Sequence, residues 1–454
     1  MADGEAKPFK ISQKMLVVDE RGVHTRRVVD VIQEQGNKDG TNPMLVGTMA
    51  DLNNVLERYE SEYPHHARPE VSQAVHKPSQ WILNYLDECY TPDNQDGVFR
   101  HTDIQTFAQC INTLCINVDP TTAMLDLQSP MYVLGDIHGN YKDLNYLSKN
   151  IVQFNSLKYS AVNLLFLGDY VDRGPYSVET AAWILAMRAK FPLRVNVLRG
   201  NHEFYSVNGD EATYGSGSFF AQCKELWGPK QGEAIWNDFN TFFDGLAFAA
   251  VVDERIFCVH GGIPRPLDDK SADPLQLLRD PVFPIFTELW PHDEDDDLVR
   301  EQRRIASDMV WSDPAPEDHE AFLDADGFGP NMFRDPTGRL PVFGSKALTE
   351  FLQKHNFDFI IRAHEIKADG IQITKHARVI TVFSSSGYCG SDNGSAAVFI
   401  NEGKLRFILA SRSANRKRTG AATFSRCDSE FVGLVRTNSS IAERKPPAAQ
   451  KSLR

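Results

Sequence analysis

Short apolar runs, each ended by a cluster of glycine and polar residues, recur through the middle of the chain. They occupy residues 131–134, 164–167, 195–198, 256–259, 359–361 and 379–383. Runs of this length bounded by turn residues are typical of buried strands. Buried strands that alternate with helices predict an α/β core. Catalytic groups and metal ligands in such cores usually lie where strands end and loops begin.

The chain on either side of this core has a different pattern. Residues 1–77 are polar and weakly periodic, and we interpret them as an N-terminal extension of uncertain order. Apolar residues then recur at helical spacing near Trp81 and again near Phe107, which predicts two helices before the first strand. From residue 411 the chain is basic and has little with which to build a core, so we expect a disordered tail over 411–454. One folded domain is therefore expected over residues 78–410.

Composition and charge narrow the class of protein. Of 454 residues, 42% are hydrophobic and 24% are charged, as in soluble globular proteins. The net charge of −13 argues against general affinity for nucleic acid. The chain has no apolar run near the roughly 18 residues of a membrane span and no apolar secretory signal at its start.

The cysteines and the tail bear on location. Seven scattered cysteines without a Cys-x-x-Cys pair indicate reduced thiols. We expect a cytoplasmic and/or nuclear protein with no membrane partner. The triplet Arg416-Lys417-Arg418 could be a nuclear signal, but a solvated tail is the favoured interpretation.

The polar clusters supply two aspartates, one asparagine and three histidines as candidate metal ligands. These residues are Asp136, His138, Asp169, Asn201, His260 and His364. Oxygen and imidazole ligands without thiolates suit manganese, iron, zinc or magnesium. Six ligands are too many for one ion that must keep open positions, but they suit two ions that share a bridging carboxylate. Two such ions can hold a hydroxide and bind phosphoryl oxygens on the same face.

Together the clusters resemble the signature of the phosphoprotein phosphatase family, which includes protein phosphatases 1 and 2A and calcineurin. The principal matches are Gly135-Asp136-Ile137-His138-Gly139-Asn140, Gly168-Asp169-Tyr170-Val171-Asp172-Arg173-Gly174, Gly200-Asn201-His202-Glu203, His260-Gly261-Gly262 and Arg362-Ala363-His364. Further matches are Trp311-Ser312-Asp313-Pro314, Phe343-Gly344 and Tyr388-Cys389-Gly390. The similarity extends from about Trp81 to about Ser411. It implies a central β-sandwich flanked by helices, a four-layer α/β/β/α fold, over the expected domain.

The resemblance also implies two metal ions, manganese, iron or zinc, bridged by Asp169. One ion would be bound by Asp136 and His138, and the other by Asn201, His260 and His364. By the same resemblance, regulatory or targeting subunits are expected as partners.

The catalytic roles follow from the same motifs. His202 would protonate the leaving oxygen of serine or threonine, and Asp172 would orient that imidazole. A positioned acid is useful because alkoxide is a poor leaving group. Arg173 would bind the phosphate with its fork of donors. Tyr388 would lie in a loop that overhangs the site.

Three segments depart from the family pattern. A second phosphate-binding arginine is expected before Phe343-Gly344, where the candidates are Arg334 and Arg339; neither has the usual spacing, and we favour Arg339. The loop 384–389 reads Ser-Ser-Ser-Gly-Tyr-Cys and lacks the family's proline, which puts substrate preference in doubt. The stretch between Gly262 and Trp311 looks long and contains the acidic run 293–297, which we interpret as a solvated loop in a surface elaboration.

The predicted function is a serine/threonine protein phosphatase that hydrolyses phosphoproteins by in-line attack of a hydroxide held between two metal ions. No cysteine has an arginine six positions later, and Asp324-Ala325-Asp326 continues as Gly327-Phe328, so cysteine-dependent and aspartyl-phosphate mechanisms are disfavoured. Two alternatives stay open. One is a metallophosphoesterase for small molecules such as dinucleoside polyphosphates, and the other is a binding or scaffold protein that keeps the fold without activity.

Overall fold

The computed structural model describes residues 14–19, 22–27, 72–91, 98–151, 157, 160, 162–411 and 423–425. The chain divides into two compact units, Met1–Glu70 and Val71–Arg454. In the first unit, β1 (Lys14–Asp19) and β2 (Gly22–Arg27) pair antiparallel, with Asp19 opposite Gly22. This hairpin lies in the extension 1–77, for which the sequence predicted no element.

The described strands of the second unit form two six-stranded sheets and one three-stranded sheet. The first large sheet has the order β13-β14-β12-β8-β7-β3 and contains β3 (Met124–Leu127), β7 (Ala249–Val252), β8 (Ile256–Val259), β12 (Phe359–Arg362), β13 (Ile371–Thr374) and β14 (Val379–Val382). The second has the order β17-β16-β15-β4-β5-β6 and contains β4 (Met131–Leu134), β5 (Asn163–Phe166), β6 (Val195–Val197), β15 (Ser395–Asn401), β16 (Lys404–Ser411) and β17 (Thr423–Ser425). The small sheet contains β9 (Asp313–Pro314), β10 (Phe328–Pro330) and β11 (Pro341–Phe343).

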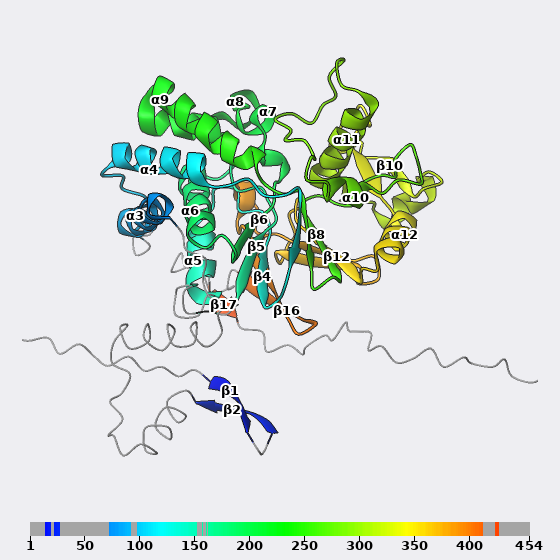
Figure 1. Ribbon diagram of the computed structural model, residues 1–454, viewed down its shortest axis with the longest axis horizontal. Helices are drawn as coiled ribbons and strands as arrows, with labels where there is room; N and C mark the ends of the chain where they lie inside the picture. The colour runs from blue at the N-terminus through cyan, green and yellow to red at the C-terminus, as the bar shows by residue number, and fades with distance from the viewer. Residues whose placement is uncertain are drawn as a thin grey trace, which may run out of the picture. The chain divides into compact units, whose positions relative to one another are not determined.

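Helices cover the outer faces of both large sheets (Figure 1). On the second sheet lie α3 (Gln73–Cys89), α4 (Ile104–Asn117), α5 (Tyr141–Ile151), α6 (Ser177–Lys190) and α9 (Phe219–Asp244), with the short α7 (Tyr205–Asn208) and α8 (Glu211–Tyr214) nearby. On the first sheet lie α10 (Pro274–Leu278), α11 (Asp297–Trp311) and α12 (Ser345–His355). The helices α3 and α4 precede the first strand of this unit, as the periodicity around Trp81 and Phe107 predicted.

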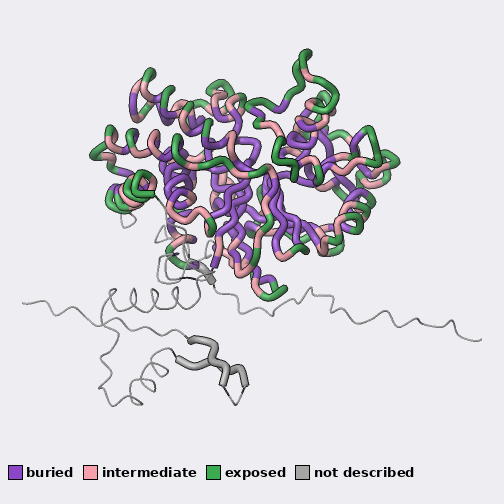
Figure 2. The backbone as a smooth tube through the Cα atoms, viewed as in Figure 1, coloured by how far each residue is buried: buried purple, intermediate pink, exposed green. Residues whose placement is uncertain are grey.

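The core has three parts, which Figure 2 shows as a buried centre flanked by partly exposed helices. Strand β8 contributes side chains to two of these parts of the core. Ile256 and Cys258 point between the sheets, whereas Phe257 and Val259 pack under the helices of the first sheet, because successive side chains of a strand point to opposite faces. The result is two sheets packed face to face with helices on both outsides.

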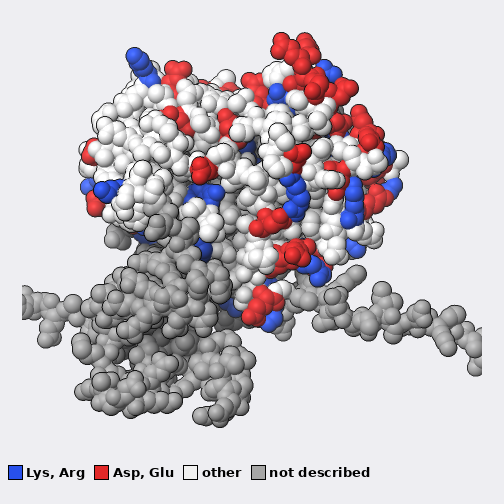
Figure 3. All heavy atoms as spheres, in the orientation of Figure 1, with Lys and Arg blue, Asp and Glu red and all other residues white. Residues whose placement is uncertain are grey.

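The sequence also made explicit predictions for the acidic run 293–297 and for the basic tail 411–454. Acidic side chains gather around α11 and the segment before it (Figure 3). The run 293–297, expected to be a solvated loop, is a largely exposed turn that leads into α11, and only Asp297 belongs to the helix itself. Asp296 caps the helix by accepting from the Val299 amide at 2.8 Å, and Asp295 pairs with Arg303 at 2.7 Å.

The basic tail, expected to be disordered, is described only at residue 411 and in β17, which pairs antiparallel with β16, and the triplet 416–418 lies outside the described residues. Within the described part of the chain, no helix is long and apolar enough to cross a membrane.

Candidate active site

Parallel strands bring five of the polar clusters to one edge of the sandwich. β4, β5 and β6 run parallel in one sheet, and β8 and β12 run parallel in the other. Their carboxyl ends lead to the candidate ligands, which are Asp136, His138, Asp169, Asn201, His260 and His364. The two sheets are joined at this edge, because the His364 amide donates to Asp136 Oδ1 at 2.8 Å. All six ligands are buried.

One group of ligands gathers around His260. Its Nε2 lies 3.0 Å from Asn201 Oδ1, 3.0 Å from His364 Nδ1 and 3.3 Å from Asp169 Oδ2. Its Nδ1 donates to the Leu167 carbonyl at 3.0 Å. Since the proton of a neutral imidazole is then on Nδ1, the lone pair of Nε2 faces other acceptors. A cation fits between such groups.

The second group gathers around His138. Its Nε2 lies 3.5 Å from both Asp136 Oδ2 and Asp169 Oδ2, and its Nδ1 donates to the Val171 carbonyl at 2.9 Å. Burial alone would lower the pKa of His138, but the two carboxylates raise it to about 9. This histidine therefore faces negative charge that a proton or a metal ion can balance.

Asp169 is shared by the two groups. Its carboxylate stands with His138 and His202 on one side and with His260 and His364 on the other, and each trio has ligand atoms within 4.8 Å of one another. Although burial would raise the pKa of Asp169, the surrounding imidazoles lower it. An ionised carboxylate common to two clusters is what a bridge between two ions requires.

A histidine–aspartate pair lies beside the ligands. His202 Nδ1 donates to Asp172 Oδ2 at 2.6 Å, and Asp172 Oδ1 accepts from the Phe219 amide at 2.7 Å. Because Asp172 fixes the ring, Nε2 of His202 points toward the ligands and lies 4.0 Å from Asp169 Oδ2. This is the arrangement expected of a positioned general acid.

Two more expected residues lie at the mouth of this group. The guanidinium of Arg173 lies over the ring of Tyr214, 4.3 Å from its centroid. The ring of Tyr388 lies beside that of His138, with centroids 4.9 Å apart. Tyr388 therefore lies next to a candidate ligand, and Arg173 lies on Tyr214, whose ring centroid is 5.4 Å from that of His202.

The candidate second arginine is Arg334 by position. It pairs with Asp313 and donates from Nη2 to the carbonyl of His364 at 3.0 Å. The structure does not bring Arg339 to the site: its guanidinium lies 4.0 Å from the ring centroid of Trp290, and its Nε donates to Thr337. The preference for Arg339 stated above therefore has no support from the geometry.

Several of these residues have left-handed backbones. The φ angles are 46° for His138, 57° for Asp169, 66° for Asp172, 70° for Arg173 and 69° for His364. Such a conformation is costly for residues other than glycine and persists where the surroundings enforce it. Gly168 shows how tight the edge is: its φ is 115°, and an added Cβ would lie 2.5 Å from the Gly200 backbone.

Comparison with known proteins identifies the family to which this chain belongs. Residues 129–368, more than half of the chain, match the family model described as calcineurin-like phosphoesterase. The chain belongs to the calcineurin-like phosphoesterase family.

A solved structure shows the same fold. A protein serine/threonine phosphatase from Saccharomyces cerevisiae, with similarity to human phosphatase PP5, is 22% identical, covers 75% of this chain and 92% of its own, and has a TM-score of 0.50. A cold-active protein-tyrosine phosphatase of a psychrophilic Shewanella species is 16% identical, with coverages of 67% and 83% and a TM-score of 0.43.

The family assignment confirms the resemblance drawn from the motifs, and the layers described above confirm the fold class. The protein is a phosphoesterase. Members of this family use dinuclear metal sites, and the groups around Asp169 supply candidate ligands for one.

The phosphoesterase site also uses buried charges to which the sequence gave no role. Glu203 accepts from three amides of the ligand loops: Asp169 at 2.7 Å, Tyr170 at 2.9 Å and Gly200 at 2.9 Å. Burial, together with the nearby Asp169, raises the pKa of Glu203 to about 7. Its position directly after His202, within the Gly200-Asn201-His202-Glu203 motif, was the available signal.

The loop 384–389 is tied to the rest of the phosphoesterase site by its serines. Ser384 Oγ accepts from the Gly135 amide at 2.8 Å, and Asn140 donates to Ser385 Oγ at 3.2 Å. These bonds anchor the start of the loop next to the Gly135-Asp136 motif. The expected effect of the lost proline on substrate preference stays a prediction.

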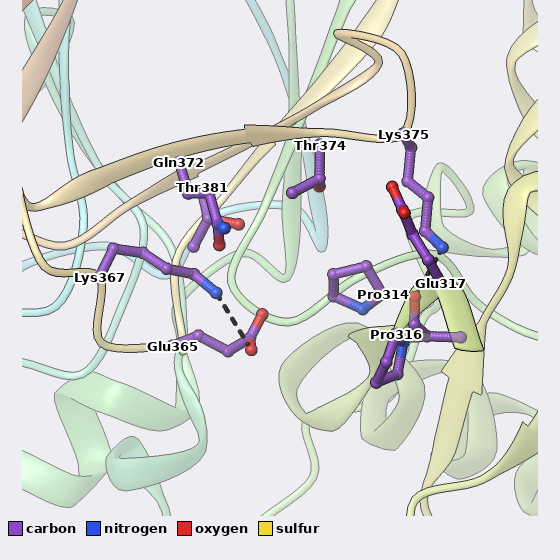
Figure 4. A pocket seen from close by; sticks show the side chains of 10 residues that line it. Pro314, Pro316, Glu317, Glu365, Lys367, Gln372, Thr374, Lys375 and Thr381 are labelled. Carbon is purple, nitrogen blue, oxygen red and sulfur yellow. Dashed lines mark hydrogen bonds and ion pairs between the residues drawn. The ribbon is translucent and has the colours of Figure 1, made fainter. Parts of the chain in front are cut away.

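A cavity of about 210 Å³ lies beside the phosphoesterase site, between the residues that follow β9 and the β13–β14 hairpin (Figure 4). Glu365 lines it, contacts Lys367 at 3.2 Å and also pairs with the fully buried Arg362. Arg362 pairs with Asp313 at 2.8 Å, and Asp313 holds Arg334. An unbroken series of ion pairs therefore leads from this cavity to the candidate active site.

Proposed function

We propose that this phosphoesterase is a serine/threonine protein phosphatase. The observation that carries the proposal is the His202–Asp172 pair, 2.6 Å apart, set beside a carboxylate shared by two ligand groups. A seryl or threonyl alkoxide is a poor leaving group and gains most from a positioned proton donor. A phenolate needs that proton much less, so the pair favours alkyl over aryl phosphates.

Each residue of the candidate active site has a separate role in the proposed reaction. Arg173 and Arg334 would bind and orient the phosphoryl oxygens. His202 would deliver its Nε2 proton to the leaving oxygen while Asp172 stabilises the ring. When bound, two ions such as manganese, iron or zinc supply an activated water and neutralise phosphoryl charge. No side chain needs to take up the phosphoryl group, which predicts inversion at phosphorus.

Protein substrates are supported by the motif matches outside the ligands, namely the Tyr388 segment and the run 168–174. The yeast neighbour bears the description of a protein serine/threonine phosphatase, in line with this assignment. We further propose regulatory or targeting subunits as partners and a cytoplasmic or nuclear location.

The test compares the wild-type chain with Asp169→Asn and His202→Ala on a phosphothreonine peptide with added manganese. Loss of the shared carboxylate should abolish metal-dependent turnover. Loss of the acid should slow turnover by roughly 10²–10⁴-fold, and less for p-nitrophenyl phosphate, whose leaving group hardly needs a proton.

Parallel substrates separate the alternatives. Faster turnover of a phosphotyrosine peptide, or of diadenosine tetraphosphate, than of the phosphothreonine peptide would replace the proposed specificity. A metal-loaded wild-type protein that hydrolyses no ester would support the scaffold interpretation instead.

A further inference from the structure

A second large cavity lies at the far end of the strands that carry His260 and His364. It measures about 630 Å³ and is bordered by the end of α12 and by the residues that precede β8, β12 and β14. Each of these strands has four described residues, so at least ~13 Å of strand separates it from the metal ligands. Its volume falls in the range of small-molecule sites, roughly 300–1,000 Å³.

The lining of this cavity is basic, in a chain whose net charge is −13. Arg255, Arg378 and His376 line it, against a single acidic residue, Asp358. Asp358 pairs with Arg255 at 2.6 Å, while Arg378 donates to the hydroxyl of Thr349 at 2.7 Å. Within the described part of the chain, the guanidinium of Arg378 therefore has no carboxylate partner.

The strand order sets the spacing of the two arginines. β8 and β14 flank β12 in the sheet, and Arg255 and Arg378 directly precede Ile256 and Val379. Neighbouring strands are ~4.8 Å apart, so the two backbones stand about 10 Å apart across β12. Two arginines that extend from backbones at this separation can contact a ligand with more than one anionic group.

Two further observations indicate that the cavity is prepared for a ligand. The Nε atom of Arg255 is buried and has no hydrogen-bond partner among the residues that the structure describes. The turn before Arg378 holds Lys375, His376 and Ala377 at φ angles of 51°, 56° and 63°. A left-handed backbone is unfavourable for residues other than glycine, and strain of this kind is found where function requires a fixed geometry.

We propose that this cavity binds a small organic anion with two or more sulfonate-, phosphate- or carboxylate-type groups. One group is held by the guanidinium of Arg255 and another by Arg378 with His376 nearby. Phe357 and Leu352 border the space between them and suit a non-polar ligand body. The site is separate from the metal ligands and does not depend on which phosphoester the enzyme hydrolyses.

The test uses pyranine, a fluorescent aromatic trisulfonate, with the metal-loaded full chain. Its sulfonates are not phosphoesters, so the phosphoesterase cannot cleave them. Fluorescence anisotropy should show one saturable site. Arg255→Gln and Arg378→Gln should each weaken binding by at least about tenfold, and Arg378→Lys should weaken it less than Arg378→Gln.

Matched control variants distinguish binding of the dye in this cavity from its attraction to other positive charges of the protein. Lys354→Gln removes one positive charge from α12 outside the cavity, and Arg173→Gln removes one at the metal site; neither should change affinity by more than about twofold. Equal loss in Lys354→Gln would mean diffuse surface attraction, and loss in Arg173→Gln would place the dye at the metal site. Either result, or no binding by the wild-type protein, would overturn the proposal. Unchanged hydrolysis of p-nitrophenyl phosphate by the Arg255 and Arg378 variants shows that they are folded.

Discussion

Arg334 and Arg339 belong to one loop, but their side chains contact different residues. Arg334 is held between Asp313 and the carbonyl of His364, whereas Arg339 lies on the ring of Trp290 and is exposed. We expect Arg334→Ala to lower kcat/KM by roughly 10²–10³-fold, the usual effect of removing one donor that stabilises transition-state charge. Arg339→Ala should change it by less than about threefold. Steady-state kinetics with the phosphothreonine peptide measure both.

A lysine at each position is the control for charge alone. Arg334→Lys keeps the charge but loses the fork that can contact Asp313, His364 and phosphate together. It should remain well below the wild type. The assignment fails if Arg339→Ala is the more damaging change while the unfolding temperatures of the two variants agree.

Sequence spacing favoured Arg339, and the loop shows why its side chain lies on Trp290 instead of at the ligands. The Asp335 carboxylate accepts from the amides of Thr337 and Arg339 at 2.9 and 3.0 Å, which closes a tight turn. That turn directs Arg339 away from the ligands. The distance to Phe343-Gly344 along the chain says nothing about such a turn, so the choice needed the coordinates.

At the scale of helices and strands, the polar clusters were predictable because each directly follows a buried run. The parallel pairing of β4 with β5 and of β8 with β12 then brings those ends together. Contacts between distant segments were not predictable in this way. Arg362 reaches Asp313 across 49 positions, and neither residue belongs to a local pattern that signals the pair.

The end of α12 carries a pH-sensitive group. His355 lies between the rings of Phe351 and Phe357, with centroids 4.8 and 5.6 Å away. Burial lowers the pKa of His355 despite the nearby Asp273. The neutral ring therefore contributes stability above the unfolded pKa of about 6.5, and this contribution is lost as the pH falls toward the lower folded value.

The measurement is the unfolding temperature between pH 7 and about pH 5.5 for the wild type and His355→Gln. The wild type should be the more stable at pH 7, and the difference should shrink on acidification. A difference that stays constant over this window would show that His355 acts by packing alone.

At the scale of the whole molecule, metal should stabilise the fold as well as serve the reaction. The candidate ligands come from both sheets, so ions bound among them would tie the sheets together. A ligand at a free concentration one hundred times its Kd adds about 2.7 kcal/mol to the free energy of unfolding. Chelation should therefore lower the unfolding temperature, and manganese should restore it. Asp169→Asn is the control, because its unfolding temperature should respond little to either treatment.

The left-handed backbones of His138, Asp169, Asp172, Arg173 and His364 have a consequence for how this enzyme can be improved in the laboratory. Each holds a conformation that glycine adopts freely and that costs other residues about 1 kcal/mol or more. A library of variants screened only for resistance to heat would therefore favour glycine at these positions. The selected variants would be more stable proteins that no longer cleave phosphate esters. Any such screen must therefore also measure turnover.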